Sequence, residues 1–303
     1  MSNINNKKSY VETELAKEFL LLTPGDSLQS ISYYEERFNV SRGTVQKAIK
    51  ALGESGAVKI ETRGRNGSFI QEIDYAMVQE YYGIGTIIGC LTMPASITTK
   101  GLITALYNNL NILDCNIVYA RNAEIRIKML KKGKCDFTVC SLHSALLYSK
   151  NQNDIKILFN FGPYTYTSER IKIFRDSSKT DFDTTMRIAY DSENDDYVGL
   201  MNFLLDNNKK YNLVETKTQR ILKALRDNLV DAGMWSIDDA KTIDMNLGIA
   251  KITTPDVIDY TTAVLLVRSD DFLTQSLLEK YINISRVIKT QYEVVNGLRE
   301  PDY

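Results

Sequence analysis

Along the first quarter of the chain, the spacing of apolar and polar positions predicts three helices followed by two strands. Apolar residues recur every three or four positions in the first helix, with charged residues on its other faces. An Asn-Gly step between the strands is a strong signal for a hairpin. The predicted helices are 8–22, 30–38 and 41–52, and the predicted strands are 57–61 and 68–73. This order of elements is that of a winged helix-turn-helix.

From residue 86 the pattern changes to short apolar runs that alternate with helical patterns. Such alternation predicts α/β sheets with parallel strands, and its two successive runs predict two lobes. The predicted strands are 86–92, 115–120, 135–140, 155–161, 186–190, 213–216, 231–235, 247–252 and 262–267. The predicted helices are 100–110, 123–132, 142–149, 196–205, 219–228 and a long segment over 271–298 with a break near Asn283.

These patterns predict a multidomain protein with an α+β head and a two-lobed α/β domain. The predicted divisions are a head over 1–73, a linker over 74–83, and a domain over 84–303 whose first lobe is 84–163 with 261–303 and whose second is 164–260. The last helical segment has an apolar face that predicts either a dimer contact or packing within the first lobe. Its residues are Leu277, Leu278, Tyr281, Ile284, Val287, Ile288, Val295 and Leu298.

Composition is that of a globular protein. The 303 residues are 44% hydrophobic and 25% charged, with a net charge of −1, so a nucleic-acid contact requires a local basic patch. The sequence contains no apolar run long enough to span a membrane and no secretory signal, which predicts a cytoplasmic protein. Four cysteines without metal-ligand spacing predict reduced thiols and no metal; they are Cys90, Cys115, Cys135 and Cys140.

The helix predicted over 41–52, with Ser41 as its N-cap, has the two faces that a DNA-recognition helix needs. Its apolar stripe consists of Val45, Ala48, Ile49 and Leu52. Arg42 can pair with guanine and Gln46 with adenine, whereas nearby lysines suit phosphates. The candidate DNA-binding residues are Ser41, Arg42, Gly43, Thr44, Gln46, Lys47 and Lys50 in this helix, and Arg63 and Arg65 in the hairpin turn.

Charge is segregated along the head. Residues 37–67 contain seven lysines and arginines against two acids, a local charge of +5, whereas residues 1–36 carry −3. The basic segment therefore coincides with the predicted DNA face. The alternative, a winged helix that contacts only protein, gives this segregation no purpose.

The segment TPGDSLQSISYYEERFNVSRGTVQKAIKALGESGAVKIETRGRNGSFI resembles the GntR-type winged helix. The shared features are P-G-D-x-L, V-S-R-x-T-V, L-x-x-x-G-x-V and the G-S-F tip. Gln46 stands where that type usually has a second arginine, and the second helix departs from the usual S-E-R-x-L-A. The whole chain resembles the YhfZ family of regulators, and this resemblance implies that a type II periplasmic-binding-protein-like domain follows the head.

In that fold, two lobes close on a small ligand, and amides at helix N-termini hold anionic groups. The candidate ligand-binding residues lie in loops after strands: Pro94, Ser96, Thr98, Thr99, Ser141, His143, Asn160, Gly162, Asp191 and Trp235. Alternatives stay open. Ser96 and Thr98 can simply cap a helix, and Trp235 can belong to the core. The negative charge of the acidic loop 191–196 disfavours an anionic ligand on that lobe. The loop either binds an amine or is simply solvated.

The sequence therefore predicts a one-component regulator that binds a double-stranded DNA operator as a homodimer and senses a small molecule of unknown identity, without a cofactor. An α/β enzyme is one alternative, although His143 is the single histidine and no catalytic motif accompanies it. A chorismate-lyase-like effector domain is another, and it requires an antiparallel sheet. An extracytoplasmic solute-binding protein does not fit the missing signal and the DNA-binding head.

Overall fold

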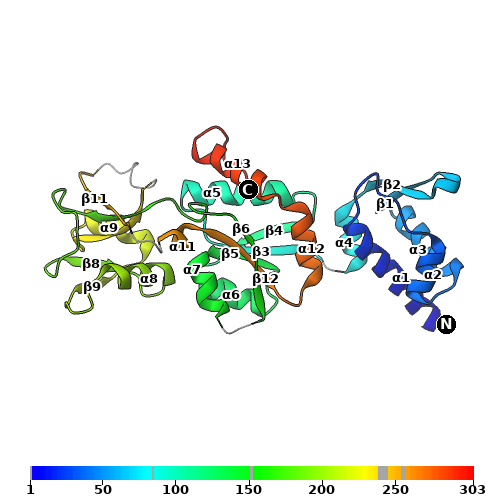
Figure 1. Ribbon diagram of the computed structural model, residues 1–303, viewed down its shortest axis with the longest axis horizontal. Coiled ribbons are helices and arrows are strands. Elements are labelled where there is room, and N and C mark those ends of the chain that lie inside the picture. The colour runs from blue at the N-terminus through cyan, green and yellow to red at the C-terminus, as the bar shows by residue number, and fades with distance from the viewer. Residues whose placement is uncertain (1, 84, 151–152, 238–244, 254–256) are drawn as a thin grey trace. The chain divides into compact units, whose positions relative to one another are not determined.

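The computed structural model divides into two compact units, which are described separately (Figure 1). Unit 1 comprises Met1–Ile88, Leu110–Asn116 and Phe272–Tyr281, and unit 2 comprises Gly89–Asn109, Ile117–Asp271 and Ile282–Tyr303. The structure describes residues 2–83, 85–150, 153–237, 245–253 and 257–303, excluding the side chains of 2–9 and 65.

Unit 1 contains the predicted winged helix. Its elements are α1 (Ser2–Leu20), α2 (Ile31–Phe38), α3 (Arg42–Glu54), β1 (Val58–Thr62), the 3-10 turn η1 (Gly64–Asn66) and β2 (Ser68–Ile73). The two strands pair antiparallel, as the Asn-Gly step predicted. Gly67 has a φ of 90°, a left-handed conformation that favours glycine at the tip of the wing.

The apolar stripes of α1 and α3 make the core of this domain. Val11, Leu15 and Phe19 of α1 are completely buried, as are Val45 and Leu52 of α3, and the two helices pack against each other. The helical spacing of the sequence therefore identified both core faces correctly.

The segment predicted as a linker over 74–83 forms a regular helix, α4 (Tyr75–Tyr82). The Asp74 side chain caps it by accepting a hydrogen bond from the Met77 amide at 3.1 Å. Gly83, with a φ of 79°, ends it in the left-handed region. Because α4 packs along α1, this segment extends the helical part of unit 1.

The C-terminal end of α1 is bound by side chains from distant parts of unit 1. Tyr281 of α12 (Phe272–Tyr281) donates to the Leu20 carbonyl at 3.1 Å, and Lys280 donates to the Leu22 carbonyl at 2.7 Å. The Tyr75 hydroxyl donates to the same Leu22 oxygen at 2.9 Å. Burial lowers the pKa of Lys280 to about 8. These donors satisfy carbonyls that a helix end leaves without intrahelical partners.

The first lobe is built on a five-stranded sheet in the order β4-β3-β5-β12-β6. Its strands are β3 (Ile87–Leu91), β4 (Cys115–Tyr119), β5 (Phe137–Ser141), β6 (Ile155–Asn160) and β12 (Ala263–Arg268). The associated helices are α5 (Ile97–Leu110), α6 (Ala123–Lys131), α7 (Leu142–Ser149) and α13 (Ile284–Val295).

The second lobe has a five-stranded sheet in the order β11-β7-β10-β8-β9. Its strands are β7 (Arg170–Phe174), β8 (Arg187–Tyr190), β9 (Asn212–Glu215), β10 (Ala232–Ser236) and β11 (Gly248–Lys251). Its helical elements are α8 (Asp195–Leu204), η2 (Thr218–Arg220) and α9 (Ile221–Arg226), and α11 (Val257–Thr261) precedes the return to the first lobe.

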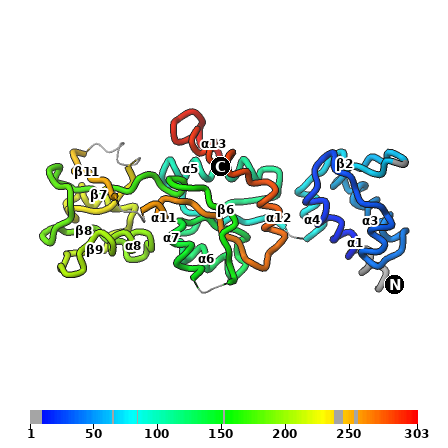
Figure 2. The backbone as a smooth tube through the Cα atoms, viewed as in Figure 1, coloured from blue at the N-terminus to red at the C-terminus, as the bar shows by residue number. Residues whose placement is uncertain are grey.

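Strand direction corrects the prediction of parallel sheets. In the first sheet, β3 and β5 run parallel, but β12 is antiparallel to both its neighbours, β5 and β6. In the second sheet, β8 runs parallel to β9 and to β10, but β7 is antiparallel to both its neighbours, β10 and β11. The chain passes between the lobes twice (Figure 2). β7 follows the passage that leaves the first lobe after β6, and β12 follows the passage that returns to it after β11. In each lobe, four strands follow one another along the chain, and a fifth enters from the other lobe, β12 in the first sheet and β7 in the second. Across each sheet the order is second strand, first, third, entering strand and fourth. This order is that of the type II periplasmic-binding-protein fold. The purely antiparallel sheet of the chorismate-lyase-like alternative is excluded.

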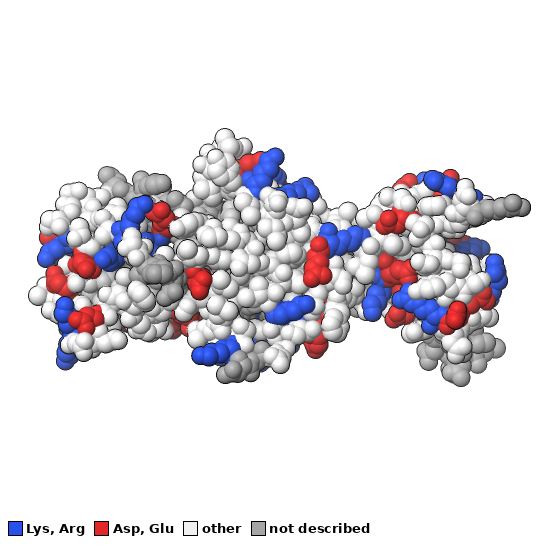
Figure 3. Space-filling view, in the orientation of Figure 1, with Lys and Arg blue, Asp and Glu red and all other residues white. Residues whose placement is uncertain are grey.

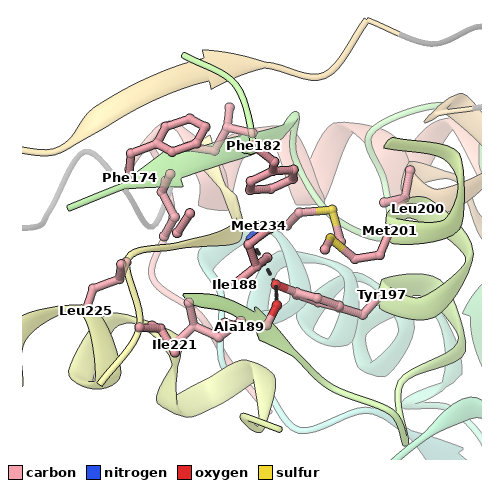
Figure 4. Close-up of a cluster of buried hydrophobic side chains, with 14 of the residues drawn as sticks. Phe174, Phe182, Ile188, Ala189, Tyr197, Leu200, Met201, Ile221, Leu225 and Met234 are labelled. Carbon is pink, nitrogen blue, oxygen red and sulfur yellow. Dashed lines mark hydrogen bonds between the residues drawn. The ribbon is translucent and has the colours of Figure 1, made fainter. Parts of the chain in front are cut away.

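The core of the second lobe surrounds a buried tyrosine (Figure 4). The Tyr197 hydroxyl donates to the Ala189 carbonyl at 2.9 Å and accepts from the Met234 amide at 3.0 Å. Phe174 and Phe182 pack in the same cluster. Because the hydroxyl group is satisfied on both sides, it ties α8 to two strands without leaving a polar atom unpaired.

The C-terminal helices confirm the predicted break, since Asn283 caps α13 by accepting from the Arg286 amide at 3.0 Å. The predicted apolar face divides into two sets. Leu277, Leu278 and Val287 are buried within the chain, whereas Ile284, Ile288 and Leu298 are exposed. Within the described ranges, we find no helix with the length and hydropathy that crossing a membrane requires.

One ion-pair network fastens the second sheet. The Asp231 carboxylate accepts from Arg187 Nε and Nη2 at 2.9 Å each and from Arg175 Nη2 at 2.6 Å. The hydrogen bonds from Arg187 hold the pKa of Asp231 well below its ordinary value. The carboxylate therefore stabilises the fold in its ionised form.

We predict that Asp231→Asn lowers the free energy of unfolding by about 1–3 kcal/mol at pH 7, because the substitution removes hydrogen bonds to a charged group. The pKa of Asp231 is lower in the folded than in the unfolded state. Its stabilising contribution is thus complete above the unfolded value, about 3.9, and is lost progressively as the pH falls from there through the lower folded value. Thermal unfolding of both proteins should give melting temperatures that differ at pH 7 and approach each other as the pH is lowered from about 4 toward the folded-state pKa.

Asp270→Asn is the matched control, because its side chain is 88% exposed and lies 3.9 Å from Arg268. Its melting temperature should stay at the wild-type value at both pH values. A difference between wild type and Asp231→Asn that does not depend on pH would contradict this account.

Candidate functional site

α3 presents the predicted polar face to solvent. Arg42, Gln46, Lys47 and Lys50 are exposed, as are Ser41 and Gly43, while Thr44 is half-buried. The opposite face is buried against α1. An α-helix with one face packed and the other polar and accessible can enter the major groove of DNA.

The N-terminus of α3 differs from the prediction in one respect. The Ser41 side chain makes no capping bond to the helix, and its hydroxyl instead lies 3.0 Å from that of Thr44. The Thr44 amide donates to the Ser41 carbonyl at 2.9 Å, which leaves the amide groups of Arg42 and Gly43 for an external acceptor. Such a helix end favours a phosphate through its free N–H groups and its dipole.

Ion pairs reduce the positive charge that the sequence predicted for this region. In Figure 3, lysines and arginines on the winged helix are interspersed with acidic residues. Four of the seven cations in 37–67 are paired: Arg37 with Glu18, Lys50 with Glu54, Lys59 with Glu72 and Arg63 with Glu61. Glu18 and Glu72 lie outside that segment, so counting charges within it overestimated the free charge.

Two predicted DNA-binding cations stay unpaired. Arg42 and Lys47 have no ion pair with any side chain that the structure describes. The side chain of Arg65 lies outside the described part. Arg42 and Lys47 are five residues apart, about 1.4 helical turns, and both are exposed, so both are available to DNA.

The wing holds Arg63 in a fixed position. Its Nε and Nη2 atoms donate to the Glu61 carboxylate at 2.9 and 2.8 Å, and its guanidinium lies 4.9 Å from the centre of the Phe69 ring. The hydrogen bonds from Arg63 lower the pKa of Glu61, which is therefore ionised at neutral pH. A DNA phosphate must compete with this carboxylate for Arg63.

We predict that Arg42→Ala and Lys47→Ala each weaken binding to a duplex of arbitrary sequence. Removing the Lys47 phosphate interaction should lower the slope of log K against log salt concentration by about 1, whereas Arg42→Ala, at a base-reading position, should change the slope less. Fluorescence anisotropy at several salt concentrations measures both quantities. Lys128→Ala, on the exposed surface of α6, is the matched control and should bind as wild type does. Unchanged slopes in both α3 variants would remove α3 from the interface.

We also predict that Glu61→Gln tightens binding to the same duplex. The substitution releases Arg63 from its ion pair and removes a negative charge near the phosphates. The gain should be severalfold at low salt and shrink as salt is raised, in the same anisotropy assay. Glu72→Gln in β2 removes the ion pair of Lys59 in β1, which is further from the wing tip, so this variant tests whether the effect is specific to the tip. Weaker binding by Glu61→Gln would contradict an Arg63 contact.

The predicted loop after β3 is anchored within the first lobe. The Ser96 hydroxyl accepts from the Thr99 amide at 3.1 Å, which is the capping bond considered in the sequence. Thr98 and Thr99 are buried and Pro94 is half-buried. Gln291 Nε2 of α13 donates to the Thr98 carbonyl at 2.9 Å and to the Thr165 carbonyl at 2.7 Å. This loop and the passage after β6 therefore share one buried amide.

The predicted residues of that passage form a turn. Asn160 Oδ1 accepts from the Gly162 amide at 2.9 Å, and Gly162 has a φ of 88°. The Thr165 hydroxyl donates to the Gly162 carbonyl at 2.5 Å and accepts from the Ala263 amide at 3.0 Å. These bonds fix the start of the first passage against the start of β12.

Ser141 and His143, at the start of α7, contact the second lobe or the passage that returns from it. The Ser141 hydroxyl accepts from the Ser144 amide at 3.0 Å, so it caps α7, and donates to the Asp196 carboxylate of α8 at 2.6 Å. His143 stacks on Tyr260 with ring centres 4.2 Å apart. The structure thus brings these two predicted residues to one interlobe site.

Asp191 and Trp235 lie elsewhere in the second lobe. The Asp191 carboxylate accepts from the amide and hydroxyl of Thr218 at 2.8 and 2.7 Å. Lys217 lies 3.5 Å from Asp191 and 2.9 Å from Glu193, so the acidic loop binds an amine of the chain itself. Trp235 is half-buried against the hydrophobic cluster, and no described residue hydrogen-bonds its Nε1.

The sequence did not identify several side chains of the interlobe site. The Ser144 hydroxyl also donates to Asp196, at 3.0 Å, and the Tyr148 hydroxyl donates to Asp195 at 2.9 Å. Burial raises the pKa of Asp195. Asp196 itself is 6% exposed, and both of its hydroxyl donors are buried. Two hydroxyl groups of the first lobe therefore hold one carboxylate of the second.

Arg126 is the second residue that the sequence did not identify. Its side chain is 1% exposed, and its Nη1 and Nη2 atoms donate to the Ala120 carbonyl and the Tyr166 hydroxyl at 3.1 Å each. Its Nε has no hydrogen-bond partner, and no carboxylate pairs with it among the described residues. The available signal was its helical position, between Ala123 and Leu130 on the apolar face of α6.

Arg126 and Asp196 influence the pKa values of the same two side chains, Cys140 and Tyr166, in opposite directions. Burial raises the pKa of the Cys140 thiol to about 12, and it raises the pKa of Tyr166 as well. In both cases Arg126 opposes the rise and Asp196 adds to it. We find no group of three or more histidine, cysteine or acidic side chains in the described ranges that could bind a metal ion.

Comparison with known proteins supplies the relatives of this chain. Residues 74–303 match the family of the YhfZ C-terminal domain, and residues 23–70 match a helix-turn-helix domain family. The uncharacterized protein YhfZ of Escherichia coli (strain K12) is 28% identical over 299 residues, 98% of each chain. The crystal structure of YhfZ from Shigella flexneri is 26% identical, with a TM-score of 0.60 over 73% of this chain and 94% of that one.

Proposed function

The chain belongs to the YhfZ family, and we propose that it is a cytoplasmic transcriptional regulator whose two-lobed domain senses a small molecule. The helix-turn-helix match over 23–70 supports the role of a DNA-binding regulator. The observation that carries the proposal is the combination of an accessible recognition helix, with unpaired Arg42 and Lys47, and a buried polar site between the lobes.

DNA contact would use the surface already described. Arg42 and Gln46 would read bases, and Lys47, Lys50 and the wing arginine Arg63 would contact phosphates or the minor groove. We regard the winged helix as GntR-like because of its V-S-R-x-T-V turn and G-S-F tip. We propose that it binds as a homodimer, with the exposed apolar residues of α13 in the contact. Such a dimer reads half-sites about 34 Å apart.

Sensing would use the interlobe site. Ser141 and Ser144 of the first lobe hydrogen-bond Asp196 of the second, so a molecule bound there changes the contacts that hold the lobes together. A ligand shifts the equilibrium between open and closed lobes only by its difference in affinity for the two. We propose that this difference controls operator binding. The polar residues support binding rather than catalysis, since the single histidine is stacked on Tyr260.

The proposal predicts that the full chain selects discrete fragments from sheared chromosomal DNA of its own organism. The enriched fragments should contain inverted repeats with centres about 10 base pairs apart, and titration should give two chains per repeat. Sequencing the retained DNA measures the enrichment. Arg42→Ala/Lys47→Ala should lose it, while Lys128→Ala should keep it.

Small-molecule pools of organic acids, phosphate esters and amines are then tested on the selected operator. A molecule that both raises the melting temperature of the protein and changes its operator affinity would be the effector. Equal retention of all chromosomal fragments, with no loss in the double variant, would contradict a regulator of this kind.

A further inference from the structure

The two lobes contact each other through α7 of the first lobe and α8 of the second. The hydroxyl groups of Ser141 and Ser144 donate to Asp196 at 2.6 and 3.0 Å, and that of Tyr148 donates to Asp195 at 2.9 Å. Ser141 is completely buried, Ser144 is 1% exposed and Asp196 is 6% exposed. The three donors are three and four positions apart, so one side of α7 faces the first turn of α8.

Gly199, one helical turn after Asp195, allows α8 to approach the other lobe closely. A Cβ atom at this position would lie 2.7 Å from the Tyr260 hydroxyl oxygen and 2.9 Å from His143 Nε2. Tyr260 belongs to the hydrophobic core of the second lobe, and its ring stacks on that of His143 in the first, with ring centres 4.2 Å apart. Any side chain at position 199 would therefore push α8 or one of these rings away.

Together these groups form what we call the interlobe latch. It consists of Ser141, His143, Ser144 and Tyr148 of α7, Asp195, Asp196 and Gly199 of α8, and Tyr260 of α11. Hydrogen bonds to carboxylates, ring stacking and a close helix contact all join the lobes, and each of them is made by the chain's own side chains.

We propose that the interlobe latch holds the lobes together without a ligand and that the effector acts by opening them. The inference rests on the proposed sensing function and specifies its regulation. A ligand that prefers an arrangement which already dominates shifts the equilibrium very little, however tightly it binds. A small molecule that signals through a latched domain must therefore bind better when the latch is open.

The test measures the separation of the lobes in the full chain with no small molecule added. Nitroxide labels on Lys128→Cys in α6 and Lys209→Cys in the second lobe report it by double electron–electron resonance, since both lysines are exposed. Cys115→Ser is present throughout, because the other three native cysteines are buried. The protein with an intact latch should give one narrow distance distribution. Gly199→Leu should give a longer or broader one, because its side chain separates α7 from α8.

Asn202→Leu is the matched control, because it adds the same side chain to α8 at an exposed position. It should keep the narrow distribution. A broad distribution with the latch intact, or a narrow one in Gly199→Leu, would overturn the proposal. If Gly199→Leu does not fold, Asp196→Ala takes its place, since it removes the acceptor of both serines. A distribution in Asp196→Ala that is as narrow as with the latch intact would equally overturn it.

Operator binding then tests whether opening of the latch is the signal. Gly199→Leu should change the affinity for the selected operator about fivefold or more with no small molecule present, whereas Asn202→Leu should bind as wild type does. Open lobes combined with wild-type operator affinity would overturn an effector that acts by opening them. The distance measurement involves no DNA, so its outcome is separate from that of the operator selection.

Discussion

The first lobe depends on a strand that reaches it only after the chain has built the second. β12 is inserted between β5 and β6, and Val264, Leu265, Leu266 and Val267 within it are completely buried. Residues 155–160 therefore lack a sheet partner until 263–268 arrive, more than a hundred positions later. The two passages between the lobes follow from this constraint, and so does the interlobe site, because the lobes cannot separate further than the passages allow.

Local pattern was enough to predict most helices and strands, since helical spacing and apolar runs are properties of neighbouring residues. Strand direction is not such a property, and the antiparallel course of β7 and β12 depends on where the chain enters each sheet. β7 was missed altogether. Its apolar residues Ile171 and Ile173 alternate with Arg170 and Lys172, a weak signal in a strand of five residues.

The candidate sites were predictable to the extent that they depend on single residues. The exposed face of α3 follows from its own periodicity, and Ser141 follows from its place after a strand. The ion pairs of Arg37 with Glu18 and Lys59 with Glu72 join residues that are far apart in the sequence, so a local charge count could not include them. Arg126 was missed because an arginine in a helix is usually solvent-exposed, and its burial depends on tertiary packing.

The contacts at the C-terminal end of α1 determine which segments must accompany the DNA-binding domain when it is transferred to another protein. The carbonyl groups of Leu20 and Leu22 take their donors from Tyr75, Lys280 and Tyr281, all beyond the conventional limit of a winged helix. A chimera that transfers only the DNA-binding sequence to another protein would leave these oxygen atoms to water and free the helix end to fray. The winged-helix domain of this protein is thus not an independent module, and a functional chimera must include α4 and α12 as well.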